Sequence, residues 1–280
     1  MKIKITMDSA CDLTPELLKR YDISVIPMHV ICNGNDYLDG VNFTPDDLFA
    51  HVEGGGACST AAINATEYDT FFAEFLPTHD AIIHVSLSSE ISACHQNAGL
   101  AALDKPIYPF DSRNLSAGAA AFAVDAAIMA ERGMEPEAII EELKKIALRA
   151  ETSFVIDTLK YLHRGGRCSS VAALGANILK LKPCIEMREG VMSVGKKYRG
   201  NFDGVILQYV KDKLQGRDDI DYSRIFIAHP NGVTAETLEN VRRTILECGP
   251  FEEIHDVMAG TTISNHSGPV TLGILYRTKP

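Results

Sequence analysis

Short apolar runs alternate along the first half of the chain with segments of helical periodicity. The runs are rich in aliphatic and β-branched residues and end at polar or turn-forming residues, which is typical of strands. The expected strands are Lys2–Met7, Ile23–Cys32, Ile82–Val85 and Ile107–Asp111. Between them, Thr14-Pro15 and Thr44-Pro45 predict helix starts, because Thr is a good N-cap and Pro fits the first helical position.

Two longer helices are expected next, at Ser116–Arg132 and Pro136–Arg149. The first is dominated by alanine, and such small side chains allow a helix to approach a sheet closely. Alternatively, the same small residues leave room for a slender apolar ligand.

The second half of the chain predicts a further α/β unit, because strands and helices alternate as in βαβ units. Its expected elements are strand Thr152–Ile156, a helical turn Asp157–Leu162, a helix around Val171–Leu179, a hairpin of Cys184–Arg188 with Val191–Arg199, helix Phe202–Leu214, strand Ile225–Ala228, helix Ala235–Cys248, strand Ile254–Val257 and, after a loop at Gly260–Pro269, strand Val270–Arg277. We therefore predict two α/β domains, residues 1–150 and 151–280, with a cleft between them.

Composition indicates a soluble globular protein, with 46% hydrophobic and 23% charged residues. No apolar run approaches the length of a membrane span, and the first residues lack the apolar core of a signal peptide. Seven cysteines, an odd number without a C-x-x-C pair, argue against a disulfide framework and against a zinc site. We expect a cytoplasmic protein with reduced thiols, no metal and no cofactor.

Charge argues against nucleic acid as a partner, because the formal net charge is −10. The segment from Lys160 to Gly200 is different: it holds nine basic and two acidic residues, a local charge of 9 − 2 = +7. This segment is either a solvated surface or a docking face for an anionic group.

The stretch Ile82–Ala98 predicts a strand, a serine-rich turn and the start of a helix. The first turn of a helix has free backbone N–H groups and favours negative charge. Ser88, Ser89 and Ser92 would add hydroxyl donors for a carboxylate or phosphate. The competing interpretation is that these serines only cap the helix.

The sequence contains none of the following nucleotide-binding and catalytic motifs. Gly190–Lys197 resembles a Walker A loop, but Lys197 occupies the position of the magnesium-binding Ser/Thr and the context predicts a hairpin. The chain has no G-x-G-x-x-G after its first strand, no G-x-S-x-G and no H-E-x-x-H.

Several segments together resemble the DegV family of bacterial fatty-acid-binding proteins. They are Asp8-Ser9-Ala10-Cys11-Asp12-Leu13, Ile26-Pro27, Tyr37-x-Asp39-Gly40, Ser59-Thr60, Ser92-Ala93-x-x-Gln96-x-Ala98, Asp157-Thr158-Leu159-x-Tyr161-Leu162-x-x-Gly165-Gly166-Arg167, Lys182-Pro183, Arg199-Gly200 and His266-Ser267-Gly268-Pro269-x-x-Leu272-Gly273. Their number, order and spacing are specific, although each segment alone is weak.

The resemblance implies two α/β domains with a ligand tunnel between them for a long-chain fatty acid. It implies a carrier, not an enzyme, that presents the carboxylate to a separate ATP-dependent fatty acid kinase. Thr60, Ser92 and His266 match the residues that would hold the carboxyl head. Arg167 and Arg199 match arginines expected to face the head group, the phosphate or the kinase, and a transient contact with a membrane surface is compatible with such a carrier.

Two motifs depart from the family pattern. The usual Ser-Gln-Pro-Ser after the threonine is Ala61-Ala62-Ile63-Asn64 here, and Ser-Gly-Thr is Ser92-Ala93-Cys94. The head group therefore has fewer side-chain hydroxyls, since Cys94 is a weak donor.

Two alternative functions remain open. One is an acyl hydrolase in which Ser92 is the nucleophile, His266 the base and Asp8 or Asp111 the acid. The other is a sensor of another apolar carboxylic acid.

Overall fold

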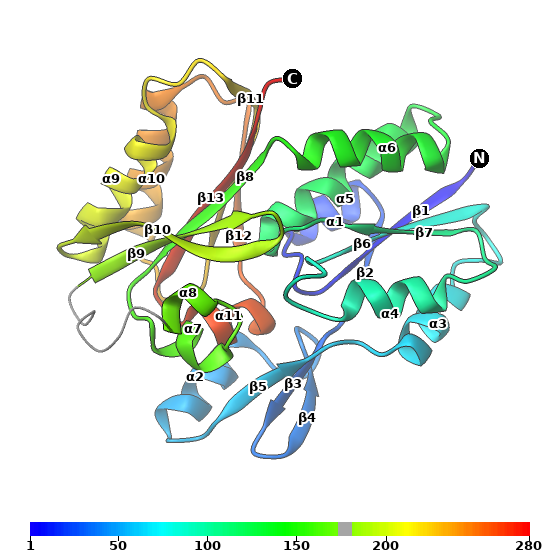
Figure 1. The fold of residues 1–280 in the computed structure, drawn as a ribbon, viewed down its shortest axis with the longest axis horizontal. Coiled ribbons are helices and arrows are strands. Elements are labelled where there is room, and N and C mark those ends of the chain that lie inside the picture. Colours follow the sequence, from blue (N-terminus) through cyan, green and yellow to red (C-terminus); the bar gives the residue numbers. More distant parts are fainter. Residues whose placement is uncertain (173–180) are drawn as a thin grey trace.

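The structure, a computed structural model, describes residues 1–172 and 181–280 and forms two lobes, each built on a β-sheet (Figure 1). The strands are β1 Ile3–Asp8, β2 Ile23–Ile26, β3 His29–Cys32, β4 Asn35–Leu38, β5 Cys58–Ala61, β6 Ala81–Ser86, β7 Ile107–Asp111, β8 Ala150–Ile156, β9 Leu181–Arg188, β10 Val191–Arg199, β11 Ile220–His229, β12 Glu253–Met258 and β13 Thr271–Thr278. The helices are α1 Pro15–Arg20, α2 Pro45–Glu53, α3 Ala65–Ala73, α4 Cys94–Ala101, α5 Ser116–Glu131, α6 Pro136–Ala147, α7 Lys160–Gly165, α8 Ser169–Ala172, α9 Phe202–Leu214, α10 Ala235–Cys248 and α11 Thr261–Ser267. The α/β class predicted from the sequence is confirmed.

The first lobe contains a four-stranded parallel sheet in the order β2-β1-β6-β7. Strands β1, β6 and β7 and the two Thr-Pro helix starts lie where the sequence predicts them. Thr14 accepts a hydrogen bond from the Leu17 backbone at the start of α1, and Thr44 forms a capping box with Asp47 at the start of α2.

A smaller antiparallel sheet, in the order β4-β3-β5, extends from the first lobe and packs against α2. The single strand predicted over residues 23–32 is wrong. The structure divides it into β2 and β3 at Pro27, whose nitrogen cannot donate to a sheet ladder, so the chain leaves one sheet and enters the other. Strand β5, which carries Thr60, therefore pairs with β3 in this small sheet.

The second lobe contains a six-stranded mixed sheet in the order β10-β9-β8-β13-β11-β12. The predicted hairpin is confirmed as β9–β10, which supports the rejection of a phosphate loop at Gly190–Lys197. Among the strands that the structure describes in this lobe, only β11 and β12, connected through α10, form a parallel βαβ pair. The other neighbouring strands of the sheet are antiparallel. The helix predicted around Val171–Leu179 falls largely outside the described residues.

The loop predicted at Gly260–Pro269 is wrong, because Thr261–Ser267 forms helix α11. The helix has Gly260 at its N-cap and Gly268, with a φ of 80°, at its C-cap. Such a short helix without a capping side chain of its own has little local signal in the sequence. It lies beside α2 and α7, close to the small sheet (Figure 1).

Helix α5 lies between the two large sheets and contacts β1 and β6 on one side and β8, β11 and β13 on the other. Six of its eight alanines are buried, so their role in close packing is confirmed. At Gly118 even a methyl group would overlap Thr152 and lie 2.9 Å from a Leu275 methyl carbon. Strand β8 begins at Ala150, near the predicted domain boundary, and the division into 1–150 and 151–280 stays a prediction.

Two of the cysteines are joined by a disulfide bond. Cys32 and Cys58, which face each other across β3 and β5, form a disulfide, so the expectation that all thiols are reduced is wrong for this pair. The other five cysteines are free. Across the described residues, every helix is too short or too polar to span a bilayer.

Candidate functional site

A cavity of about 230 Å³ lies between the two lobes. The lining residues from the first lobe are Met28, Thr60, Ala61, Ala62, Leu87, Ile91, Ser92, Ala93 and Leu115, and those from the second lobe are Phe154, Leu162, Arg167, Met192, Thr262, Ile263, His266 and Ser267. Of the five site residues selected from the sequence, four line this cavity, namely Thr60, Ser92, His266 and Arg167. The fifth, Arg199, does not line it.

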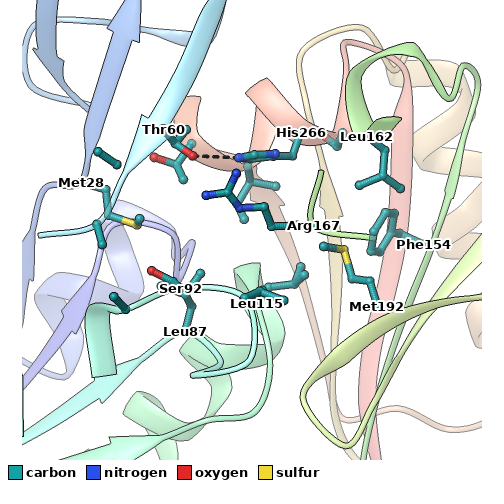
Figure 2. Close-up of a pocket in the computed structure, with 17 residues that line it drawn as sticks. Met28, Thr60, Leu87, Ser92, Leu115, Phe154, Leu162, Arg167, Met192 and His266 are labelled. Atoms are coloured by element: carbon teal, nitrogen blue, oxygen red, sulfur yellow. Dashed lines mark hydrogen bonds between the residues drawn. The ribbon is translucent and has the colours of Figure 1, made fainter. Parts of the chain in front are cut away.

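Thr60 and His266 form the polar centre of the cavity wall. The Thr60 Oγ1 atom on β5 lies 2.8 Å from Nε2 of His266 on α11 (Figure 2). This hydrogen bond connects the small sheet of the first lobe to the helix of the second. Both side chains are only partly buried, so the pair remains open to the cavity.

The surroundings of His266 determine which atom of this pair carries the proton. Its Nδ1 atom is buried against Gly165 and has no hydrogen-bond partner among the described residues. A buried N–H without an acceptor is costlier than an unused lone pair. We therefore place the proton on Nε2, which donates to Thr60, and the Thr60 hydroxyl keeps its own hydrogen for a ligand.

The His266 ring is held neutral. Burial lowers its pKa to about 4, and the positive charges of Arg167 and Arg164 act in the same direction. His266 therefore acts at neutral pH as a neutral hydrogen-bond donor that orients Thr60.

Ser92 lines the same cavity from the first lobe, two residues before the start of α4 (Figure 2). Its Oγ atom accepts a hydrogen bond from the backbone N–H of Cys94, the first residue of α4, at 3.2 Å. Ser88 and Ser89 are used elsewhere: Ser88 donates to the carbonyl of Gly190 at 2.7 Å, and Ser89 donates to Asp111 at 2.5 Å. Of the three serines proposed as anion donors, only Ser92 lines the cavity.

The two arginines selected from the sequence lie in different places. Arg167 lines the cavity and its side chain reaches toward His266 (Figure 2), with Nη1 donating to the Gly165 carbonyl at 2.9 Å. Arg199 is exposed at the end of β10, outside the cavity lining. A direct role at the head group is therefore open to Arg167 alone, and a role of Arg199 in a partner contact stays a prediction.

Thr262 is a candidate that sequence reasoning missed. It lies four residues before His266 on α11, so the two side chains share one helix face. Thr262 lines the cavity, and its Oγ1 atom is buried and has no hydrogen-bond partner among the described residues. The spacing of Thr262 and His266 would have been informative had the segment been recognised as a helix.

Two carboxylates of the first lobe hold α11 in place. Asp12 accepts a hydrogen bond from the Gly260 backbone at 2.8 Å, and Asp39 accepts one from the Thr261 backbone at 2.7 Å. These bonds satisfy free N–H groups of the helix start, where negative charge is also favourable. The first lobe thereby positions the helix that carries Thr262 and His266.

The rest of the wall is apolar. Leu115, Phe154, Leu162 and Met192 belong to one packed cluster that forms the side away from the small sheet. A second, smaller hollow of about 40 Å³ shares Leu115, Phe154 and Ile263 with the cavity. The cavity thus has polar groups at one end and an apolar wall that continues toward this hollow.

The departures from the family motifs also appear in the wall. Ala61, Ala62 and Ala93 line the cavity without a polar group, whereas Asn64 caps α3 and pairs with Glu67. Hydroxyl donors in the cavity wall therefore come from Thr60, Ser92 and Thr262.

The residues of the alternative hydrolase do not assemble into a triad. Asp8 is fully buried and accepts hydrogen bonds from Tyr68 and from the Leu87 backbone, and it also contacts His84. Asp111 binds Ser89 and the Arg113 backbone. Within the described residues, neither carboxylate contacts His266, so no acid orients this imidazole as a general base requires.

Comparison with known proteins agrees with this architecture. The family model for an uncharacterised protein of the DegV family matches residues 2–279. A DegV domain-containing protein of Clostridium perfringens is 32% identical over 283 residues, which cover 98% of each chain. Another from Caldanaerobacter subterraneus is 28% identical over 99% of each chain.

Solved structures share the whole fold. A DegV family protein from Thermus thermophilus, described as binding fatty acid, is 26% identical with a TM-score of 0.89 over 100% of both chains. A stearic-acid-binding protein from Eubacterium ventriosum is 24% identical with a TM-score of 0.84 over 98% of both chains. Because its sequence identity is below 25%, the Eubacterium ventriosum structure shows similarity of fold alone.

Proposed function

Because this chain belongs to the DegV family, we propose that it binds a long-chain fatty acid in the cavity between its two lobes. One observation carries the proposal: an apolar cavity between the lobes has the hydrogen-bonded pair Thr60–His266 in its wall. The fatty acid binding described for the Thermus thermophilus relative supports the choice of ligand.

The acyl tail supplies the affinity. Burial of about fifteen methylene groups contributes on the order of 12 kcal/mol at about 0.8 kcal/mol each, before the costs of association and ordering. In this proposal the tail runs along Leu115, Phe154 and Met192 toward the second hollow. The length and unsaturation of the acid depend on the packing of these side chains.

The carboxylate is held at the polar end. A carboxylate in an apolar cavity needs hydrogen bonds or a balancing charge. Thr60, Ser92 and Thr262 would donate hydroxyl hydrogens, neutral His266 would orient Thr60, and the Arg167 guanidinium would balance the negative charge.

We further propose that the protein is a cytoplasmic carrier that presents the carboxylate to a separate kinase. The kinase would transfer the terminal phosphoryl group of ATP to a carboxylate oxygen, with release of ADP. Such a reaction needs an accessible head group, and Ala61 and Ala93 in the cavity wall are exposed. Arg167 would balance the phosphate charge, and the exposed Arg199 would contact the kinase.

Mass spectrometry of the purified protein under native and then denaturing conditions tests the proposal. The expected result is one fatty acid per chain that is released intact on denaturation. A covalent acyl group on Ser92 with ester turnover would instead support the hydrolase. A bound acid that the kinase cannot phosphorylate would contradict the kinase step and favour a sensor of apolar acids.

Arg199→Ala separates the kinase contact from ligand binding. Because Arg199 lies outside the cavity, this variant should keep the wild-type affinity for fatty acid and slow phosphorylation by the kinase. An unchanged rate of phosphorylation would remove Arg199 from the kinase contact.

A further inference from the structure

Two cysteines and a histidine meet at the far end of the small sheet. Cys32 ends β3, Cys58 begins β5, and His51 lies in the last turn of α2, which packs on that sheet. One ligand atom from each of the three side chains lies within 4.8 Å of the other two. Fatty acid binding uses none of these side chains.

The histidine is unusual because one nitrogen of its ring is left unsatisfied. His51 Nε2 is buried and lacks a hydrogen-bond partner within the described part of the chain. Gly56 packs directly against this ring, and a side chain at Gly56 would overlap Nε2. A buried polar atom without a partner requires a physical reason, and an absent ligand is one such reason.

We propose that Cys32, Cys58 and His51 bind one borderline-soft divalent ion of the Zn²⁺ class when the protein is reduced, and that the disulfide is the oxidised, metal-free form of the same site. Two thiolates and an imidazole are preferred ligands of such ions. Zinc binds sulfur at about 2.3 Å and nitrogen at about 2.0–2.1 Å. Ligand atoms within 4.8 Å of one another therefore need only small side-chain movements once the S–S bond is opened.

The chemistry balances with an external thiol reductant. Two reductant thiols transfer two electrons and two protons to the disulfide, which becomes two cysteine thiols while the reductant becomes a disulfide. The ion then replaces the two thiol protons, which are released. Three protein ligands leave the fourth tetrahedral position to water or to an added ligand.

The disulfide and the metal-bound form would both connect the end of β3 to the start of β5. Cys58 lies two residues before Thr60 on β5. The site would thus stabilise the strand that carries a head-group residue, although it lies outside the cavity lining.

Titration with Co²⁺ tests the proposal, because Co²⁺ bound to thiolate gives a charge-transfer absorption band. Wild-type protein reduced with a phosphine should develop this band to one equivalent of Co²⁺, and Zn²⁺ should abolish it. Oxidised wild-type protein should show no band. Absence of the band from reduced wild-type protein would overturn the proposal without any variant.

Variants assign the ligands. Cys58→Ser should abolish the band, and His51→Ala should weaken Co²⁺ binding about tenfold or more, since loss of even an indirect partner of a metal ligand costs that much. Cys248→Ser is the matched control, because Cys248 is a partly exposed free thiol at the end of α10, outside the cluster. A band that survives Cys58→Ser, or an affinity unchanged in His51→Ala, would refute the site. Fatty acid binding, measured on the same samples, reports separately on the proposed function.

Discussion

The carboxylate of Asp12 accepts a hydrogen bond from the backbone N–H of Gly260 at 2.8 Å, although 248 residues separate them in the sequence. Asp12 also accepts a hydrogen bond from Ser116 at 2.6 Å. It is buried, and Asp39 caps the same helix beside it. Two acidic side chains of the first lobe thus position the helix that carries the cavity-lining residues Thr262 and His266.

The first prediction concerns the pH dependence of stability. Burial raises the pKa of Asp12 to about 7, and the charge of Asp39 acts in the same direction, while hydrogen bonds from Ser116 and Gly260 oppose the rise. The folded protein therefore binds more protons than the unfolded chain between about pH 4 and pH 7. The contribution of Asp12 to the free energy of unfolding should fall as pH rises through this window, by at most about 1.4 kcal/mol per pH unit.

Urea denaturation at several pH values checks this prediction. Asp12→Asn removes the titrating group, so the unfolding free energy of wild type minus that of the variant should fall as pH rises from about 4 toward 7. The exposed Asp218→Asn should follow the wild-type curve. Parallel curves for wild type and Asp12→Asn would contradict the raised pKa.

The second prediction concerns the charge on His266. Its pKa of about 4 reflects burial and the nearby Arg167 and Arg164. Titration by NMR should show a neutral His266 ring above pH 5. Arg167→Ala should raise this pKa, whereas Arg199→Ala should leave it unchanged, because Arg199 is not among the groups that shift it. An equal change of the His266 pKa in both variants would contradict a direct electrostatic effect of Arg167 on the ring.

The third prediction concerns the hydroxyl of Thr262. Thr262→Val removes a proposed donor to the carboxylate and should lower fatty acid affinity by about 1.5–3 kcal/mol, or roughly 10–150-fold. Without ligand, the variant should be as stable as wild type or more stable, because the substitution also removes a buried hydroxyl with no partner among the described residues.

Titration with a fatty acid and with its methyl ester measures this effect. The substitution should lower the affinity for the acid much more than the affinity for the methyl ester. Ser59→Ala is a matched control, since Ser59 is exposed on β5 next to Thr60 but outside the cavity lining. An affinity for the acid that Thr262→Val leaves unchanged would remove Thr262 from the head-group site.

The fourth prediction concerns the packing of α5 between the sheets. Gly118→Ala should destabilise the protein by about 1–3 kcal/mol, because the added methyl group would overlap Thr152 and crowd Leu275. Gly99→Ala on α4 is the matched control, since a methyl group there meets no atom of the described residues within 4 Å. This control should be neutral or stabilising by about 0.5–1 kcal/mol. Chemical denaturation compares the two, and equal stabilities would contradict the tight packing at Gly118.

The sequence by itself determined the elements whose signals are local. Thr44 and Pro45 define a helix start through contacts within a few residues, and the helices Phe202–Leu214 and Ala235–Cys248 have the predicted bounds. The family motifs also identified Thr60, Ser92, Arg167 and His266, which line one cavity.

Only the tertiary structure decided the features that depend on distant contacts. Helix α11 is stabilised by Asp12 and Asp39, so its own segment resembles a loop, and Thr262 was missed as a result. The disulfide depends on the register of β3 with β5, which the spacing of Cys32 and Cys58 does not reveal. Arg167 and Arg199 carry the same charge and similar motifs, but only the folding of the chain places the first at the cavity and the second outside its lining. Local propensity acts over a few residues, whereas each of these features depends on atoms brought together from distant parts of the chain.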